Sequence, residues 1–292
     1  MKPYKIIIQL SISIALLYFI FNQKLDFLLF IDLFSKIRII DISLILFLNL
    51  VSFYLLSMRS IIVFNLETNQ KKNHHKIFFK SIFFNFFAPS NLGSDIYRLY
   101  SYKNNFKSFQ IIKLLILEKI FAFIYLIIFC FFSVLLINKI TVISFLQDFL
   151  MYIILIILLL MIIIYILYKN FVLLFNKIMI QINPFLNFHF FFYTLTSFLI
   201  WTIGIFWINK ILNLDASIFE IFVFAVLTEI VRIIPISFQG IGLREITFSS
   251  IALIFNYDFA TAFYVSTYSY IMLSISLLAC YPVSYLFKVN NE

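Results

Sequence analysis

Long apolar runs alternate with short polar segments along most of the chain. Each run has close to the roughly 20 residues that a helix needs to cross a membrane, and the total length accommodates about seven to nine helical elements. The pattern therefore predicts an all-α, polytopic helical bundle. The six long runs are Tyr4 to Phe21, Asp41 to Phe64, Ile111 to Ile137, Phe149 to Tyr168, His189 to Asn209 and Asp258 to Phe287.

Two shorter apolar segments, Ile77 to Ala88 and Ile246 to Tyr257, cannot cross a membrane as helices. Each has 12 residues, which span about 18 Å at about 1.5 Å per residue, whereas the hydrocarbon core is about 30 Å thick. A third apolar stretch, Ala216 to Ile234, carries charged residues.

Two clusters of helix-breaking residues lie beside these segments. Broken backbone at membrane depth is tolerated only where it is buried in protein or lines a polar cavity. We therefore expect two interrupted, re-entrant segments, with two ordinary interhelical loops as the alternative. The clusters hold three of the four glycines and two of the five prolines: Pro89, Gly93, Pro235, Gly240 and Gly242.

The two breaks share a short pattern. Ser90 to Gly93 reads Ser-Asn-Leu-Gly, and Ser237 to Gly240 reads Ser-Phe-Gln-Gly. Interrupted hydrophobic segments at corresponding positions of two halves indicate the central site of a transporter. We expect one domain over 1–292, with repeat-like halves at about 41–137 and 189–287 in an inverted arrangement.

Composition narrows the class of protein. The chain is 64% hydrophobic and 12% charged, with a mean hydropathy of +1.06, which excludes a soluble globular enzyme, a disordered chain and a coiled coil. The net charge of +9 fits the excess of Lys and Arg in cytoplasmic loops and is compatible with attraction to anionic lipids. The basic residues form no continuous stripe, so nucleic acid is not an expected partner.

The same rule predicts the topology. Lys2 and Lys5 precede the first span and Lys288 follows the last, so both termini are expected in the cytoplasm, at the inner (plasma) membrane. Asn65 to Lys80 is expected to be a solvated cytoplasmic loop, and Asp26 to Asp41 a mixed-charge connector. A helix is expected to begin at Ser94 or Asp95 and to continue as an amphipathic segment to Gln110.

No cofactor or metal is expected. His74 and His75 are adjacent but lack a third ligand at useful spacing. Cys130 and Cys280 lie in apolar helices and are interpreted as small buried hydrophobic residues.

Seven ionisable residues lie in or beside the broken segments. Ionisable residues within a membrane indicate a functional site by default, with internal salt bridges between helices as the alternative. Arginines beside a helix N-terminus suit a lipid phosphate. The expected substrate-binding core is Asp95, Arg98, Arg244 and Glu245, surrounded by Glu118, Glu229 and Arg232.

Two further charge relationships concern single helices. Glu229 and Arg232 are three residues apart, so they can pair on one helix face. Arg59 lies within a long apolar run and is expected to face the protein interior or to extend toward the interface.

The segment 235–245, Pro-Ile-Ser-Phe-Gln-Gly-Ile-Gly-Leu-Arg-Glu, resembles the signature of the lysylphosphatidylglycerol synthase transmembrane, or flippase-like, family. The segment 88–98, Ala-Pro-Ser-Asn-Leu-Gly-Ser-Asp-Ile-Tyr-Arg, is similar to the first motif of that family. Glu118-Lys119 resembles its acidic-basic pair, where the family leads us to expect Glu-Arg.

The resemblance implies a domain that moves a phospholipid or a lipid-linked sugar between leaflets. In the family, a separate soluble domain performs the synthase reaction; we expect none here and so no synthase activity. The predicted function is a flippase-like transporter of an anionic phospholipid or lipid-linked sugar. One alternative is an accessory subunit of cell-envelope glycan or lipid assembly, with envelope-biosynthesis partners. The least favoured is a membrane enzyme acting on a lipid phosphate, so the chain is not expected to be an enzyme.

Overall fold

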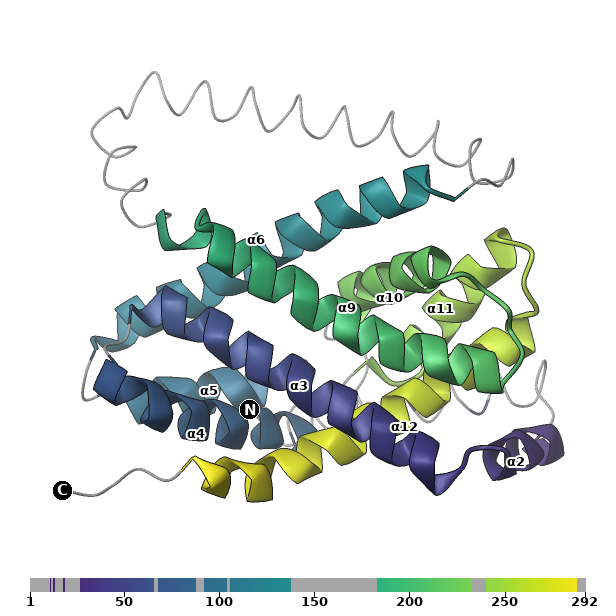
Figure 1. Ribbon diagram of the computed structural model, residues 1–292, viewed down its shortest axis with the longest axis horizontal. Helices are drawn as coiled ribbons and strands as arrows, with labels where there is room; N and C mark the ends of the chain where they lie inside the picture. The colour runs from purple at the N-terminus through teal and green to yellow at the C-terminus, as the bar shows by residue number, and fades with distance from the viewer. Residues whose placement is uncertain are drawn as a thin grey trace.

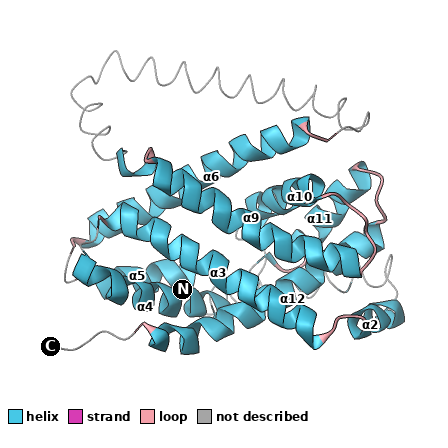
Figure 2. Cartoon of the chain, in the orientation of Figure 1, coloured by secondary structure: helices cyan, strands magenta, loops and turns pink. Residues whose placement is uncertain are grey.

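The computed structural model describes residues 27–65, 68–87, 92–103, 106–137, 183–232 and 240–287, with residues 11, 13 and 18 near the N-terminus. Throughout these ranges every regular element is helical (Figure 2). The prediction of an all-α protein is confirmed. The expected span Phe149 to Tyr168, most of Tyr4 to Phe21, residues 169–182 and Lys288 lie outside the described residues.

Among the described residues, four helices are long and apolar enough to cross a membrane. They are α3 (Ile39–Phe64), α6 (Ser108–Leu135), α9 (Phe188–Ile211) and α12 (Phe259–Val283), the last continuing into the 3-10 turn η5 (Ser284–Leu286). The chain is therefore a multi-pass membrane protein. The other described helices are shorter: α2 (Phe27–Ser35), α4 (Thr68–Phe84), α5 (Leu92–Tyr102), α10 (Ile218–Arg232) and α11 (Leu243–Ile254), with 3-10 turns η1 (Asn85–Phe87) and η3 (Asn183–Phe185).

Long and short helices follow the same order in both parts of the chain. In the first part a long helix, α3, is followed by the short pair α4 and α5 and then by the long α6; α9, α10, α11 and α12 repeat this order. The contacts are reciprocal, because α4 packs on α12 while α10 packs on α6. Helices α3 and α9 lie against each other at the centre (Figure 1).

Polar side chains define several helix ends. Asp258 accepts a hydrogen bond of 2.7 Å from the Thr261 N–H at the start of α12, and Asn187 accepts one of 2.9 Å from the His189 N–H at the start of α9. These side chains satisfy backbone donors that the first turn of a helix leaves free. Asn65 ends α3 in the left-handed conformation, with φ of 48°.

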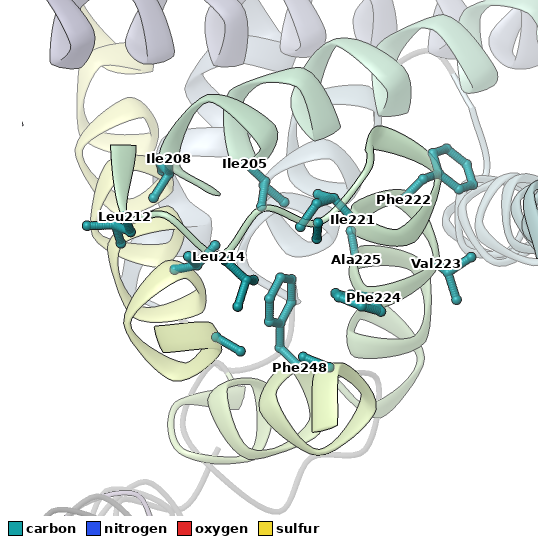
Figure 3. Packing of buried hydrophobic residues seen from close by; sticks show 14 of the residues in the cluster. Ile205, Ile208, Leu212, Leu214, Ile221, Phe222, Val223, Phe224, Ala225 and Phe248 are labelled. Atoms are coloured by element: carbon teal, nitrogen blue, oxygen red, sulfur yellow. The ribbon is translucent and has the colours of Figure 1, made fainter. Parts of the chain in front are cut away.

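Within the described part of the chain, the largest apolar core lies mainly among α9, α10, α11 and α12. Figure 3 shows side chains of α9 and α10 gathered with Phe248 of α11. Phe224 packs edge-on against Phe248, with ring centroids 5.4 Å apart, which is a favoured geometry for aromatic pairs. This core holds the short α10 and α11 against the long α12.

The polar stretch Asn65 to Lys80 is not a solvated loop, and this prediction was wrong. Most of it forms α4, which continues through Phe84. His74 and His75 are buried, and their ring nitrogens contact the hydroxyls of Tyr102 and Ser57, respectively. Tertiary contacts thus bury a face of this segment that its polar composition led us to place in water.

Three smaller expectations also change. The connector Asp26 to Asp41 contains the helix α2. The amphipathic stretch from Ser94 to Gln110 is divided between α5, which begins at Leu92, and α6, which begins at Ser108. Gly93 consequently lies in the first turn of α5, and residues 88–91 of the expected break lie outside the described residues.

Candidate functional site

Five charged side chains from three helices form one connected group, here called the charged cluster: Arg59 of α3, Asp95 and Arg98 of α5, and Glu118 and Lys119 of α6. They lie up to 60 positions apart in the sequence. The packing of α5 on α6 and of α3 on α6 brings them together.

Glu118 is the centre of the charged cluster. Its Oε1 accepts a hydrogen bond of 3.0 Å from Arg59, and its Oε2 accepts one of 2.9 Å from Arg98. The Glu118 side chain is only 2% exposed. A buried carboxylate is tolerated only when it is paired and hydrogen-bonded, and here both of its oxygens are occupied by arginines.

Asp95 connects the buried part of the charged cluster to its accessible edge. Its Oδ1 accepts a hydrogen bond of 3.3 Å from Arg98 Nη2, and its Oδ2 contacts the Lys119 ammonium. The Asp95 side chain is 20% exposed and that of Lys119 46%. Lys119 is therefore the most accessible member of the charged cluster.

Neutral side chains fix the two arginines in place. Arg98 donates a second hydrogen bond from Nη1, of 3.1 Å, to Ser60 Oγ, and its guanidinium lies 5.5 Å from the centre of the Phe78 ring. The Arg59 guanidinium lies at the same distance from the Phe190 ring. Cation–π contacts of this kind are favourable and strengthen when they are shielded from water.

All five members of the charged cluster line one cavity of about 610 Å³. Most of its other lining residues are apolar or aromatic, and they include Phe198 and Trp201 of α9. Glu229 of α10 also lines the cavity. The structure thus brings Asp95, Arg98, Glu118 and Glu229 to one cavity.

Arg244 and Glu245 are not among the described residues that line the cavity, and their expected part in the substrate-binding core stays a prediction. The Glu245 carboxylate turns back onto its own helix, where Oε2 accepts a hydrogen bond of 2.7 Å from the Gly242 N–H. This contact satisfies one of the donors at the start of α11.

Arg244 is buried at 3% exposure, and its guanidinium lies 4.5 Å from the centre of the Tyr270 ring. Among the described residues its Nε and Nη1 have no hydrogen-bond partner. Gly240 and Gly242 precede it with φ of 80° and 85°, a region that glycine enters without steric cost. Pro89, Pro235 and the side chain of Arg232 lie outside the described residues, as does the expected pairing of Arg232 with Glu229.

Two members of the charged cluster, Arg59 and Lys119, are not in the predicted site. In the sequence, Arg59 stands out only as an arginine within an apolar run, and Lys119 only as a departure from the resembled motif. The position of Arg59 and of Lys119 within an apolar run could have indicated that they belong to the site, because a charged residue at membrane depth needs a partner.

A buried polar group adjoins the charged cluster through α4 and α5. His74 contacts the hydroxyl of Tyr102, one helical turn beyond Arg98. Burial, with a smaller effect from the positive charge of Arg98, lowers the pKa of His74 from 6.5 to about 3. Burial also raises the pKa of Tyr102 above 10. Both side chains are therefore neutral near neutral pH. Within the described part of the chain, no group of side chains has the composition of a metal site.

Comparison with curated proteins and with solved structures gave no significant match. One family model matches residues 6–279, and its description is lysylphosphatidylglycerol synthase TM region. The match covers both short helix pairs and all four long apolar helices except the C-terminal end of α12 and η5. The chain therefore belongs to the lysylphosphatidylglycerol synthase TM region family.

Proposed function

We propose that this protein moves a phosphate-bearing membrane lipid, either an anionic phospholipid or a lipid-linked sugar, between the leaflets of the inner (plasma) membrane. The observation that carries the proposal is the composition of the cavity, whose lining combines the charged cluster with many apolar and aromatic side chains. A phospholipid has the same two parts. Membership of a family linked to a membrane lipid supports the proposal.

The dimensions of the cavity also support it. About 610 Å³ lies within the range of about 300–1,000 Å³ that is usual for small-molecule sites, which suits a headgroup with the first part of its acyl chains. Ile116 and Ile120 of α6 line the cavity and are also exposed at the surface of the described protein, at 53% and 47%. They provide an apolar path by which acyl chains could reach the bilayer.

Transport is favoured over catalysis by the state of the carboxylates. A general base needs a carboxylate within reach of the proton that it removes. In the charged cluster, Glu118 and Asp95 each contact two cationic side chains. We therefore propose no chemical step for this site.

We also propose that the N- and C-termini lie in the cytoplasm and that the two short helix pairs enter the membrane from opposite faces. The distribution of lysines supports the first part. The matching order of long and short helices, with reciprocal packing of α4 on α12 and α10 on α6, supports the second. Inverted pairs of this kind place the substrate site near the middle of the membrane.

A headgroup-resolved assay in proteoliposomes tests the proposal. The purified protein is reconstituted with tail-labelled phosphatidylglycerol or with a labelled lipid-linked sugar, and bleaching from outside measures movement. We expect faster movement of at least one of these lipids than in protein-free liposomes. Rates equal to those of protein-free liposomes for both would overturn the proposal.

A bulky substitution inside the cavity tests whether lipid movement depends on this site. Ser197 of α9 is buried and lines the cavity, and among the described residues its hydroxyl bonds only to a carbonyl of its own helix. Ser197→Trp should therefore fill the space and stop movement. Ile203→Trp is the matched control, because Ile203 lies on α9 with 39% of its surface exposed. Thermal unfolding in detergent shows whether both variants fold. If folded Ser197→Trp moved lipid at the wild-type rate, the cavity would not be the path.

A further inference from the structure

The charged cluster contains one more cation than it has carboxylates. Among the described residues, Arg59, Arg98 and Lys119 form ion pairs with Asp95 and Glu118. The three cations differ in accessibility, since the Arg98 side chain is 6% exposed, that of Arg59 is 12% exposed and that of Lys119 is 46% exposed. The surplus positive charge can therefore be reached through Lys119.

Lys119 can also separate from Asp95 without leaving a buried charge unpaired. If its ammonium moves away, Asp95 still has its ion pair with Arg98. Displacing Arg98 would instead disrupt its pairs with both Glu118 and Asp95 and leave a buried arginine without those partners. Breaking a buried ion pair in this way is strongly unfavourable. The two arginines are therefore fixed parts of the protein, whereas the contact of Lys119 with Asp95 can be exchanged.

We propose that Lys119 binds the phosphate of the lipid headgroup and that Asp95 holds the ammonium when no lipid is present. This inference rests on the proposed function and identifies the side chain that selects for an anionic headgroup. A lysine suits the role because its ammonium has three donors on a flexible stem and can turn from one acceptor to another. The arginines supply the fixed positive potential behind it.

Tryptophan fluorescence measures binding separately from movement. The chain has two tryptophans; Trp201 lines the cavity, whereas Trp207 is 42% exposed and bonds to Asp41. Trp207→Phe leaves Trp201 as the reporter. Phosphatidylglycerol with brominated acyl chains is titrated into this variant in detergent micelles, and quenching gives the Kd. Brominated diacylglycerol, which lacks the phosphate, is the reference ligand.

In the Trp207→Phe background, Lys119→Gln should weaken phosphatidylglycerol binding by about tenfold, as expected for the loss of one charge-assisted contact. Binding of diacylglycerol should not change. Lys119→Arg, which keeps the charge, should remain within about threefold of the parent. Lys103→Gln is the matched control, because Lys103 is exposed, lies over the Tyr100 ring and does not line the cavity.

The outcomes separate this inference from the proposed function. Equal phosphatidylglycerol affinity in Lys119→Gln and its parent would overturn the role of Lys119, even if the wild-type protein moved lipid in proteoliposomes. A tenfold loss restricted to phosphatidylglycerol would support the role of Lys119 even if no lipid movement were found. An equal loss for diacylglycerol, or an equal loss in Lys103→Gln, would also overturn the assignment.

Discussion

Arg98 of α5 donates a hydrogen bond of 2.9 Å to Glu118 of α6, and both side chains are almost completely buried. The same carboxylate accepts a hydrogen bond from Arg59 of α3. Three helices are thereby joined at one carboxylate, on the wall of the cavity in which we place the lipid headgroup. The contact combines a structural role with an electrostatic one, because it holds two positive charges beside that cavity.

Replacing Glu118 by Gln should strongly destabilise the fold. The variant leaves two buried guanidinium groups without their shared carboxylate, and removing one partner of a buried ion pair costs about 3–5 kcal/mol. The measurement is the free energy of unfolding in mixed micelles. Asp215→Asn is the control, because the Asp215 side chain is 76% exposed and pairs with Lys210 at 3.5 Å; such surface pairs contribute about 1 kcal/mol or less. Equal stability of Glu118→Gln and the wild type would contradict the structural role.

The stability of the protein should fall as the pH is lowered from 7 to 5. The pKa of His74 is about 3 in the fold because the ring is buried, compared with about 6.5 in the unfolded chain. Between these values the unfolded chain binds a proton that the folded protein does not. The stabilising contribution is therefore complete above pH 6.5 and is lost as the pH falls toward 3, by about 2 kcal/mol at pH 5.

Denaturation of His74→Gln at both pH values tests this expectation. The variant should lose most of the pH dependence, whatever its stability at pH 7. His189→Gln should retain the wild-type dependence, because His189 is exposed at the start of α9. If the stability of His74→Gln fell between pH 7 and pH 5 as much as that of the wild type, another group would be responsible for the pH dependence.

Arg244→Ala should abolish lipid movement while the protein stays folded and inserted. Arg244 does not line the cavity described above, so this prediction concerns a second contact for the lipid phosphate: the buried Arg244 Nε and Nη1 have no hydrogen-bond partner among the described residues. For the same reason the substitution removes few polar contacts of the protein itself. The loss of its stacking on Tyr270 should cost about 0.5–2 kcal/mol. The proteoliposome assay gives the rate, and thermal unfolding gives the stability. Wild-type movement in the variant would remove Arg244 from the functional residues.

Position 73 should be inaccessible from outside the cell. Asn73 is exposed on α4, and the positive-inside rule places the lysines of this segment in the cytoplasm. A cysteine at position 73 should react with a membrane-impermeant maleimide only after the cells are opened. The native Cys130 and Cys280 are buried and should give little background. Strong labelling in intact cells would reverse the proposed topology.

The sequence by itself determined the class of protein and the bounds of the long helices. In a membrane, backbone N–H and C=O groups must form their hydrogen bonds within the segment, and a helix does this for a long apolar run. The predicted runs Asp41 to Phe64 and His189 to Asn209 accordingly match α3 and α9 to within a few residues. The motif at 235–245 also led to the family that the comparison shows.

Only the tertiary structure decided which charges meet. Periodicity places a side chain on a helix face, but the partner of Glu118 depends on how α3, α5 and α6 pack. The same limit explains the wrong prediction for α4. Its lysines and histidines are typical of a loop, and only the tertiary structure shows the contacts of its histidines with Ser57 and Tyr102 on a buried face. It also explains Glu245, because a carboxylate three residues from Gly242 can cap its own helix and need not face a cavity.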